Sequence, residues 1–134
     1  MSKFKLNIVT YSKKLMEREV KYLKVRTVEG DIGILANHSP LVVELSPGEM
    51  KIKDDNKDEY YYLSGGFLEI SNNVVNIIAD QVIYSSDIDY QRAQDQVEEA
   101  KLLMEKAKND DKAFLMAEKK LKEALAKMSM KNRL

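Results

Sequence analysis

The sequence contains no cysteine, one histidine, two prolines and five glycines. Without cysteine the chain has no disulfide framework, no thiolate metal site and no cysteine nucleophile. A single histidine, His38, excludes a multi-histidine metal site and leaves one residue through which a Ser-His-Asp triad would have to run. We therefore expect no metal site and no catalytic site in this chain.

The sequence also has no excess of positive or negative charge and no long hydrophobic run. The 22 basic and 22 acidic residues cancel, so no overall charge attracts nucleic acid. No apolar run approaches the roughly 20 residues that span a bilayer. Residues 3–9 alternate polar and apolar side chains, whereas a signal peptide has a continuous apolar block. We expect a soluble, cytoplasmic protein that binds no nucleic acid.

Residues 1–86 have the pattern of β-strands. Phe4, Leu6 and Ile8 alternate with polar residues, as in a strand with one buried and one solvated face. Turn-forming residues divide the region into short pieces, and Asn72-Asn73 between two apolar runs predicts a β-hairpin. Seven or more short strands predict an antiparallel β-sandwich or flattened barrel.

From residue 87 the period becomes helical. Two seven-residue repeats are separated by Asn109-Asp110-Asp111, whose carboxylates can cap the second helix. Residues 87–134 therefore predict an antiparallel two-helix hairpin that forms a second domain. Its apolar seam consists mostly of alanine and methionine, which contribute less burial energy than leucine. The hairpin could detach from its packing partner or could be docked permanently.

Residues 30–43 concentrate the turn-forming residues of the chain. They include two of the five glycines, one of the two prolines and His38, which predicts a loop of specified shape. Catalysis by His38 is disfavoured because the adjacent Ser39 cannot readily face it. We expect these residues to form a contact surface.

The second predicted helix and the tail after it are strongly basic. Residues 112–134 contain seven basic and two acidic residues, a net charge of +5. This charge could attract an acidic partner, or it could simply keep the hairpin soluble.

Four stretches carry a resemblance to a known family: GDIGIL with NHSPL at 30–35 and 37–41, LSPG at 45–48, SGGFLEI with NVV at 64–70 and 73–75, and IDYQRA at 88–93. In this order and spacing the chain resembles the bacterial epsilon subunit of the F-type ATP synthase. The likeness covers the whole chain. It departs at Ala36, where the family often has proline, so this loop is expected to be slightly less rigid.

The resemblance implies a non-catalytic rotor subunit of the central stalk, which couples proton or sodium flow to ATP synthesis. Its partners would be the gamma subunit, the c-subunit ring and the alpha/beta hexamer. It would lie at the cytoplasmic face of the cell membrane, reaching the membrane only through the complex. An extended hairpin would inhibit ATP hydrolysis. The alternative is a stand-alone β-sandwich binding module that dimerises through its helices.

The resemblance also implies roles for individual residues. Asp31 and His38 would contact the c-ring. No cofactor is required, but regulatory ATP would bind at the start of the first helix, where the matching residues are Ile88, Asp89, Arg92 and Ala93. The structural alternative is that Asp89 caps the helix and Arg92 pairs with a nearby carboxylate. The residues implied to dock the hairpin on the catalytic hexamer are Lys119, Lys120 and Lys122.

Overall fold

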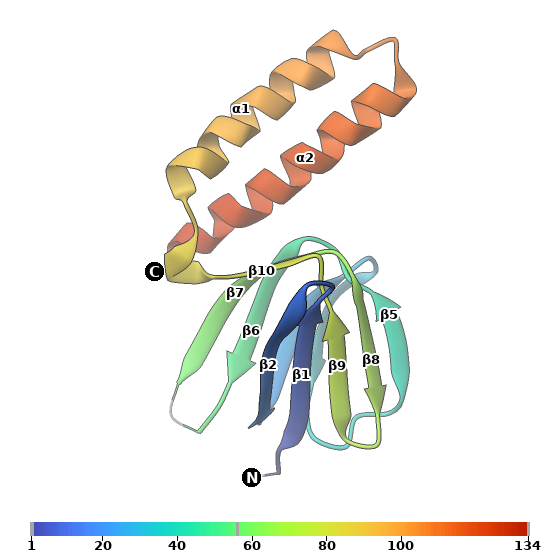
Figure 1. Cartoon of the computed structure of the whole chain (residues 1–134), viewed down its shortest axis with the longest axis vertical. Helices are drawn as coiled ribbons and strands as arrows, with labels where there is room; N and C mark the ends of the chain where they lie inside the picture. The colour runs from blue at the N-terminus through green and yellow to red at the C-terminus, as the bar shows by residue number, and fades with distance from the viewer. Residues whose placement is uncertain (1, 56, 134) are drawn as a thin grey trace. The chain divides into compact units, whose positions relative to one another are not determined.

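The computed structural model describes residues 2–55 and 57–133, so Met1, Asn56 and Leu134 lie outside the described part. The chain divides into two compact units, Met1–Tyr84 and Ser85–Leu134 (Figure 1). The first unit is built from strands and the second from helices. None of the helices in the described residues is long and apolar enough to cross a membrane.

The first unit is a sandwich of two five-stranded sheets (Figure 1). Sheet A contains, in spatial order, β2 (Lys13–Val20), β1 (Phe4–Thr10), β9 (Val74–Ile78), β8 (Phe67–Ser71) and β5 (Leu41–Glu44). Sheet B contains, in spatial order, β10 (Gln81–Tyr84), β7 (Asp58–Ser64), β6 (Gly48–Lys53), β3 (Tyr22–Thr27) and β4 (Gly30–Ile34). The predicted sandwich is confirmed, and within the described residues the sheets do not close into a barrel.

One strand pairing differs from a purely antiparallel sandwich. β1 pairs with β9 in parallel, from Lys5 opposite Val74 to Val9 opposite Ile78, whereas the other strand pairings are antiparallel. This pairing joins segments about 70 residues apart in the sequence. It arises because the first strand inserts between β2 and β9 and becomes an internal strand of sheet A.

The core of the sandwich lies between the two sheets. Phe4, Leu6 and Ile8 are at most 1% exposed, as their period-two spacing predicts. β3 and β6 contribute side chains by the same alternation. Burial of each large apolar side chain contributes roughly 1.5–3 kcal/mol. The buried cluster comprises Phe4, Leu6, Ile8, Val20, Leu23, Val25, Ile34, Leu45, Met50, Ile52, Leu63, Leu68, Ile70, Val75, Ile77 and Ala79.

The predicted hairpin at Asn72-Asn73 is also confirmed. Ser71 pairs with Val74, so the turn has two residues, and both asparagines adopt left-handed backbone angles, with φ of 51° and 61°. Asparagine tolerates this region better than most residues, and paired positive φ values suit the twist of a hairpin.

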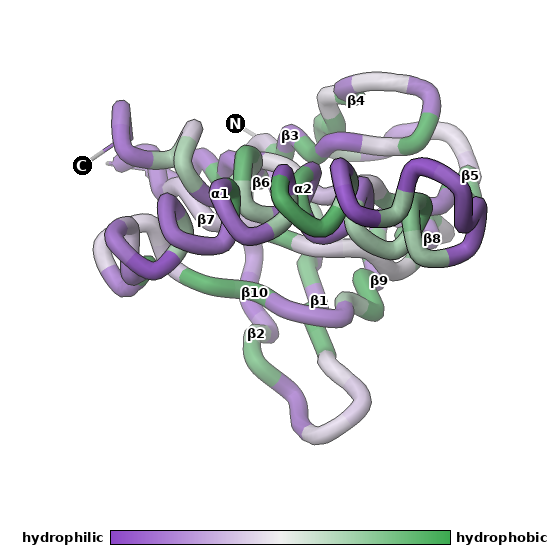
Figure 2. The backbone as a smooth tube through the Cα atoms, turned by 90° about the horizontal axis from the view of Figure 1, so that it is seen from above, coloured by the Kyte–Doolittle hydropathy of each residue, from purple (hydrophilic) through white to green (hydrophobic). Residues whose placement is uncertain are grey.

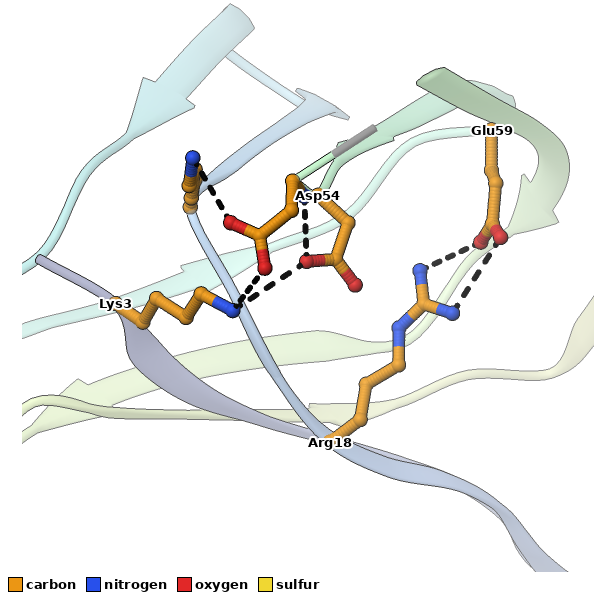
Figure 3. A network of polar contacts seen from close by, with 6 residues as sticks. Lys3, Arg18, Asp54 and Glu59 are labelled. Carbon is orange, nitrogen blue, oxygen red and sulfur yellow. Dashed lines mark hydrogen bonds and ion pairs between the residues drawn. The ribbon is translucent and has the colours of Figure 1, made fainter. Parts of the chain in front are cut away.

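An ion pair clamps the two sheets together at one edge of the sandwich (Figure 3). Arg18 of β2 donates from Nη2 to Oε1 of Glu59 at 2.5 Å and from Nη1 to Oε2 at 3.4 Å. Glu59 of β7 also accepts from the Tyr61 hydroxyl at 3.1 Å and lies 3.1 Å from Lys57 Nζ. We call Arg18 and Glu59 the inter-sheet clamp.

The environment of the clamp favours its charged form. Burial alone would raise the pKa of Glu59, but hydrogen bonds from Arg18 and Lys57 outweigh it and hold the pKa below its usual value. Burial, and then the Glu59 carboxylate, raise the pKa of Tyr61 to about 12. The clamp is therefore ionised, with Tyr61 as a neutral donor, at neutral pH.

A second charged cluster fastens the start of β1 to the connection between β6 and β7 (Figure 3). Lys3 Nζ lies 2.7 Å from Asp55 Oδ2 and 3.7 Å from Asp54 Oδ1, and Lys21 Nζ lies 2.9 Å from Asp55 Oδ1. Hydrogen bonds from Lys3 and then Lys21 lower the pKa of Asp55 to about 2.

The second unit is a helical hairpin flanked by single turns: η1 (Ser85–Asp87), α1 (Tyr90–Lys106), α2 (Asp111–Ser129) and η2 (Met130–Arg133). Asp89 and Asp110 cap the helices by accepting from the amides of Arg92 and Ala113 at 3.0 and 3.1 Å. Figure 2 shows that α1 is mostly hydrophilic, whereas hydrophobic and hydrophilic residues alternate along α2.

The seam between the helices is as weakly packed as the sequence predicts. Its fully buried residues are small: Ala93, Val97, Ala100, Ala117 and Ala124. The larger residues of the predicted repeats are only half-buried: Met104, Phe114, Leu121 and Met128. The two helices therefore share little buried apolar area.

Candidate functional site

Residues 30–43 do not form one loop. Gly30–Ile34 is strand β4 and Leu41–Val43 belongs to strand β5, so only residues 35–40 connect them as a loop. This corrects the expectation of a continuous shaped loop. The alternation of Ile32 and Ile34 with Asp31 and Gly33 was the strand signal that the glycines concealed.

Asp31 lies near the start of β4, beside the turn that joins β3 to β4. Its carboxylate accepts from Arg26 Nε at 2.7 Å and from Arg26 Nη2 at 3.5 Å, and Lys24 Nζ lies 3.8 Å away. The Asp31 side chain is still 38% exposed. This end of the sandwich therefore presents a compact, charged surface.

His38 lies in the loop after β4. Its Nδ1 is 2.7 Å from the carbonyl oxygen of Ser39, so Nδ1 carries the proton. In the β3–β4 register, Asp31 faces Arg26 beside the hairpin turn, whereas Ile34, which leads into the loop, faces Leu23 at the far end. The structure therefore separates Asp31 and His38 by the length of β4 and does not bring them together.

The outer face of sheet A carries an apolar row that the sequence reasoning missed. Phe67 pairs with Ile78, and Ile78 pairs with Val9, so three outward side chains lie across three neighbouring strands. Phe67 is 56% and Ile78 57% exposed, and Val42 on β5 is 71% exposed. We call Val9, Phe67, Ile78 and Val42 the apolar row. In the sequence, the sign of this row is an apolar residue at strand positions that the alternation places on the outer face.

Polar side chains lie beside the apolar row on the same face. Asn7 Nδ2 donates to Asn76 Oδ1 at 3.0 Å, and Asn76 Nδ2 donates to Glu69 Oε1 at 3.4 Å. Glu69 also stands opposite Val42 in the β5–β8 pair. An exposed apolar surface with a polar border is typical of a protein-binding site.

A groove of about 300 Å³ runs along one edge of the helical hairpin. Three cationic side chains from both helices line it, together with two carboxylates and a glutamine. The lining residues are Arg92, Gln96, Glu99, Ala100 and Leu103 from α1, and Lys120, Glu123, Ala124 and Lys127 from α2. This arrangement can hold an anion between the helices.

The groove contains only one of the residues that the family resemblance implied for nucleotide binding. Arg92 lines it, but Asp89 is the cap of α1, as the structural alternative proposed. Ile88 and Ala93 are 6% and 1% exposed and do not line the groove. Lys127 was missed, although its spacing of seven residues from Lys120 would place both on one helix face.

The three lysines predicted to dock the hairpin do not share one face of α2. Lys119, Lys120 and Lys122 are all exposed, but only Lys120 lines the groove. At 100° per residue, Lys119 and Lys122 lie on the side of α2 that faces away from α1. They are therefore available to a partner that contacts the back of α2.

The hairpin tip exposes large apolar side chains. Leu102 and Leu103 near the end of α1 are 62% and 43% exposed, and Leu115 and Met116 near the start of α2 are 61% and 57% exposed. Isolated exposed apolar residues are ordinary, but a group at one end of a hairpin indicates a contact surface.

Comparison with known proteins identifies relatives of both units. Residues 3–85 match the family model for the β-sandwich domain of the ATP synthase delta/epsilon chain, and residues 86–132 match the model for its long α-helix domain. The sodium-ion-specific ATP synthase epsilon chain of Propionigenium modestum is 46% identical over 128 residues, covering 96% of this chain and 93% of that protein. The epsilon chain of Halalkalibacterium halodurans is 35% identical, with 96% of each chain covered.

Solved structures agree with the sequence relatives. A chain in the cryo-EM structure of the Euglena gracilis mitochondrial ATP synthase, containing OSCP, F1 and the c-ring, superposes with a TM-score of 0.84. It is 25% identical, and the match covers 94% of this chain and 79% of that one. A chain of the Tetrahymena thermophila mitochondrial ATP synthase central stalk and c-ring, 17% identical with a TM-score of 0.57, shares the fold over 66% of this chain and 71% of that one.

Proposed function

Because the chain belongs to the ATP synthase delta/epsilon family, as a non-catalytic epsilon chain of the bacterial type, we propose that it is a rotor subunit that couples ion flow to ATP synthesis. The observation that carries this proposal is the match of both units, in order, over nearly the whole chain. Its partners are the gamma subunit, the c-subunit ring and the alpha/beta hexamer. In the cell it lies at the cytoplasmic face of the membrane as part of the complex.

The apolar row is the surface that we assign to the gamma subunit. Phe67 and Ile78 are more than half exposed on adjacent strands, and an aromatic residue near the centre of such a patch is a frequent anchor of protein interfaces. The polar border formed by Asn7, Asn76 and Glu69 would form the rim of the interface.

Phe67→Ser and Ile78→Ser are each expected to weaken binding to purified gamma subunit by about tenfold or more, because interface anchors cost upwards of about 1–2 kcal/mol when truncated. Isothermal titration measures the affinity. Leu115→Ser is the matched control, since Leu115 is equally exposed but lies in the other unit. Unchanged affinity in both sandwich variants would contradict this assignment. A tight self-dimer without affinity for gamma, seen by light scattering, would favour the stand-alone binding module instead.

Asp31 and His38 are assigned to different partners because they lie at opposite ends of β4. The charged end around Asp31 suits the polar loops of the c-ring. The loop of His38 leads into β5, whose Val42 belongs to the apolar row, and on this ground we assign the loop to the gamma subunit. Leu35 in the same loop is 60% exposed.

Because Asp31 and His38 are assigned to different partners, their alanine variants should affect different measurements. Asp31→Ala removes the carboxylate that Arg26 and Lys24 hold, and should lower coupled ATP synthesis in the reconstituted complex without changing gamma affinity. His38→Ala should lower gamma affinity about three- to tenfold, the scale of a lost hydrogen bond or small contact. Normal coupling and normal affinity in both variants would remove both residues from these interfaces.

The hairpin is the part that we propose inhibits ATP hydrolysis. Three features of the hairpin support this role: the outward lysines Lys119 and Lys122, the exposed apolar tip, and the weakly packed seam. A cationic helix is suited to an acidic segment of the catalytic hexamer. A soft seam permits the helices to rearrange when they reach that segment.

A second candidate function is regulation by ATP bound in the charged groove. Arg92, Lys120 and Lys127 come from both helices, so a polyphosphate between them would hold the hairpin closed. Glu99 and Glu123 line the same groove and compete for the cations. We therefore expect weak binding, in which Lys120 and Lys127 add to the positive charge of Arg92.

Isothermal titration of the full chain with ATP tests the groove. Arg92→Ala and Lys120→Ala should each weaken binding by about tenfold, since a charge-assisted contact to phosphate contributes roughly 1.5–3 kcal/mol. Lys119→Ala is the matched control, because this neighbouring lysine lies outside the groove. The absence of heat at millimolar ATP in the unmodified chain would end the proposal.

A further inference from the structure

The two asparagines of the β8–β9 turn share a backbone conformation but differ in their contacts. Asn72 and Asn73 have φ of 51° and 61°. Asn72 is exposed, and its side chain forms no hydrogen bond with the residues that the structure describes, whereas the amide of Asn73 is partly buried and bonded at both ends. Backbone geometry alone explains an asparagine at either position, but it does not explain the contacts of Asn73.

Asn73 joins three segments of the sandwich. Its Oδ1 accepts from the backbone amide of Asn37 at 2.7 Å, and its Nδ2 donates to the carbonyl oxygen of Lys3 at 3.0 Å. Its own carbonyl oxygen accepts from the amide of Lys5 at 3.2 Å. One residue thus connects the hairpin turn, the start of β1 and the loop of residues 35–40.

The contact with Asn37 falls at the position where the loop needs support. Asn37 has φ of 64°, an unusual conformation for a residue other than glycine. Its amide lies next to His38, and His38 in turn bonds its own neighbour Ser39. With alanine rather than proline at position 36, the loop has no ring to fix its backbone there, so the Asn73 side chain is an external brace at this turn.

We propose that Asn73 is the positioning residue of the gamma-contact loop, residues 35–40. This inference rests on the proposed function only for the identity of the partner. The side-chain amide suits this position because it donates to the carbonyl oxygen of Lys3 and accepts from the backbone amide of Asn37 at the same time. Glycine keeps the turn but removes both bonds, and aspartate keeps the acceptor but loses the donor.

Three variants of the full chain separate these contributions. Asn73→Gly is expected to accelerate hydrogen exchange of the Asn37 amide about tenfold and to weaken gamma binding about three- to tenfold, the scale of one lost hydrogen bond. Asn73→Asp should retain Asn37 protection and most of the affinity. Asn72→Gly, which changes the same turn without touching the amide bridge, should match the unmodified protein in both measurements.

The outcomes distinguish the positioning role from the proposed function. If Asn73→Gly loses Asn37 protection but binds gamma normally, or if Asn72→Gly is equally affected, the positioning role is wrong while the assignment of gamma stands. If the unmodified chain does not bind gamma, the proposed function fails, and unchanged exchange in Asn73→Gly would separately overturn the brace. If Asn73→Gly does not fold, unprotected Asn37 in the folded Asn73→Asp variant would overturn it.

Discussion

Deleting residues 87–134 is expected to raise ATP hydrolysis by the purified complex while leaving the sandwich folded and assembled. Every residue of the sandwich core lies between Phe4 and Ala79, so the deletion removes none of them. If the inhibited state holds four-fifths to nine-tenths of the complexes, its loss raises the rate about five- to tenfold. Steady-state hydrolysis by complexes reconstituted with full-length or truncated chain measures the effect.

A charge-reversed full-length chain is the control that distinguishes inhibition through charged contacts from an effect of the mere presence of residues 87–134. Lys119→Glu with Lys122→Glu reverses the outward face of α2 and leaves the groove lysine Lys120 in place. This variant should relieve inhibition partly, and the difference from the unmodified chain should shrink as salt screens the contact. Equal hydrolysis rates with and without residues 87–134 would show that the hairpin does not inhibit this enzyme.

The mobility that this mechanism needs follows from side-chain size. Alanine dominates the fully buried seam of the hairpin, and each replacement of a leucine by alanine removes about three buried carbon groups, worth roughly 0.8 kcal/mol each. Phe114 and Leu121 are only half-buried. The helices can therefore exchange this packing for contacts with a partner at low cost in free energy.

Local patterns predicted the elements because they depend on neighbouring residues. The asparagine pair specified its hairpin, the aspartates specified the helix caps, and the heptad spacing specified which faces of α1 and α2 meet. Each of these signals lies within a single turn or helix. Local periodicity and capping carry such information without reference to the rest of the chain.

Long-range features were not predictable from the same patterns. The parallel β1–β9 pair spans about 70 residues, and the inter-sheet clamp spans 41. The separation of Asp31 from His38 depends on β4 being a strand at the sheet edge, which the two glycines concealed. The apolar row is formed by cross-strand register, so it exists only after the sheet is assembled.

The inter-sheet clamp is expected to contribute strongly to the stability of the sandwich. Glu59→Ala is expected to lower the free energy of unfolding by about 3 kcal/mol, because it leaves the Arg18 guanidinium partly buried without its carboxylate. The Glu59 side chain is 7% exposed and that of Arg18 is 31% exposed, so water compensates Arg18 only in part. Urea unfolding of the full chain, followed by circular dichroism, measures the loss.

Replacing both partners tests whether the cost comes from the unpaired charge. The double variant Arg18→Met with Glu59→Met should lie within about 1 kcal/mol of the unmodified protein, since a well-packed apolar pair often matches a buried ion pair. Glu17→Ala is the surface control, because Lys5 and Lys14 contact it in solvent, and it should cost less than about 1 kcal/mol. A double variant as unstable as Glu59→Ala would show that the clamp itself, rather than the orphaned charge, holds the sheets together.

The pH dependence of stability gives the clamp an independent signature. The folded-state pKa of Glu59 is held below its ordinary value of 4.5 by Arg18 and Lys57 against the effect of burial. Its contribution is therefore fully present above about pH 4.5 and is lost as the pH falls through the lower folded-state pKa. The double variant that replaces both clamp residues removes this titration, so its stability should fall less steeply below pH 4.5 than that of the unmodified protein. Because Asp55, whose pKa is lowered to about 2, remains in both proteins, the difference between the two curves isolates the clamp.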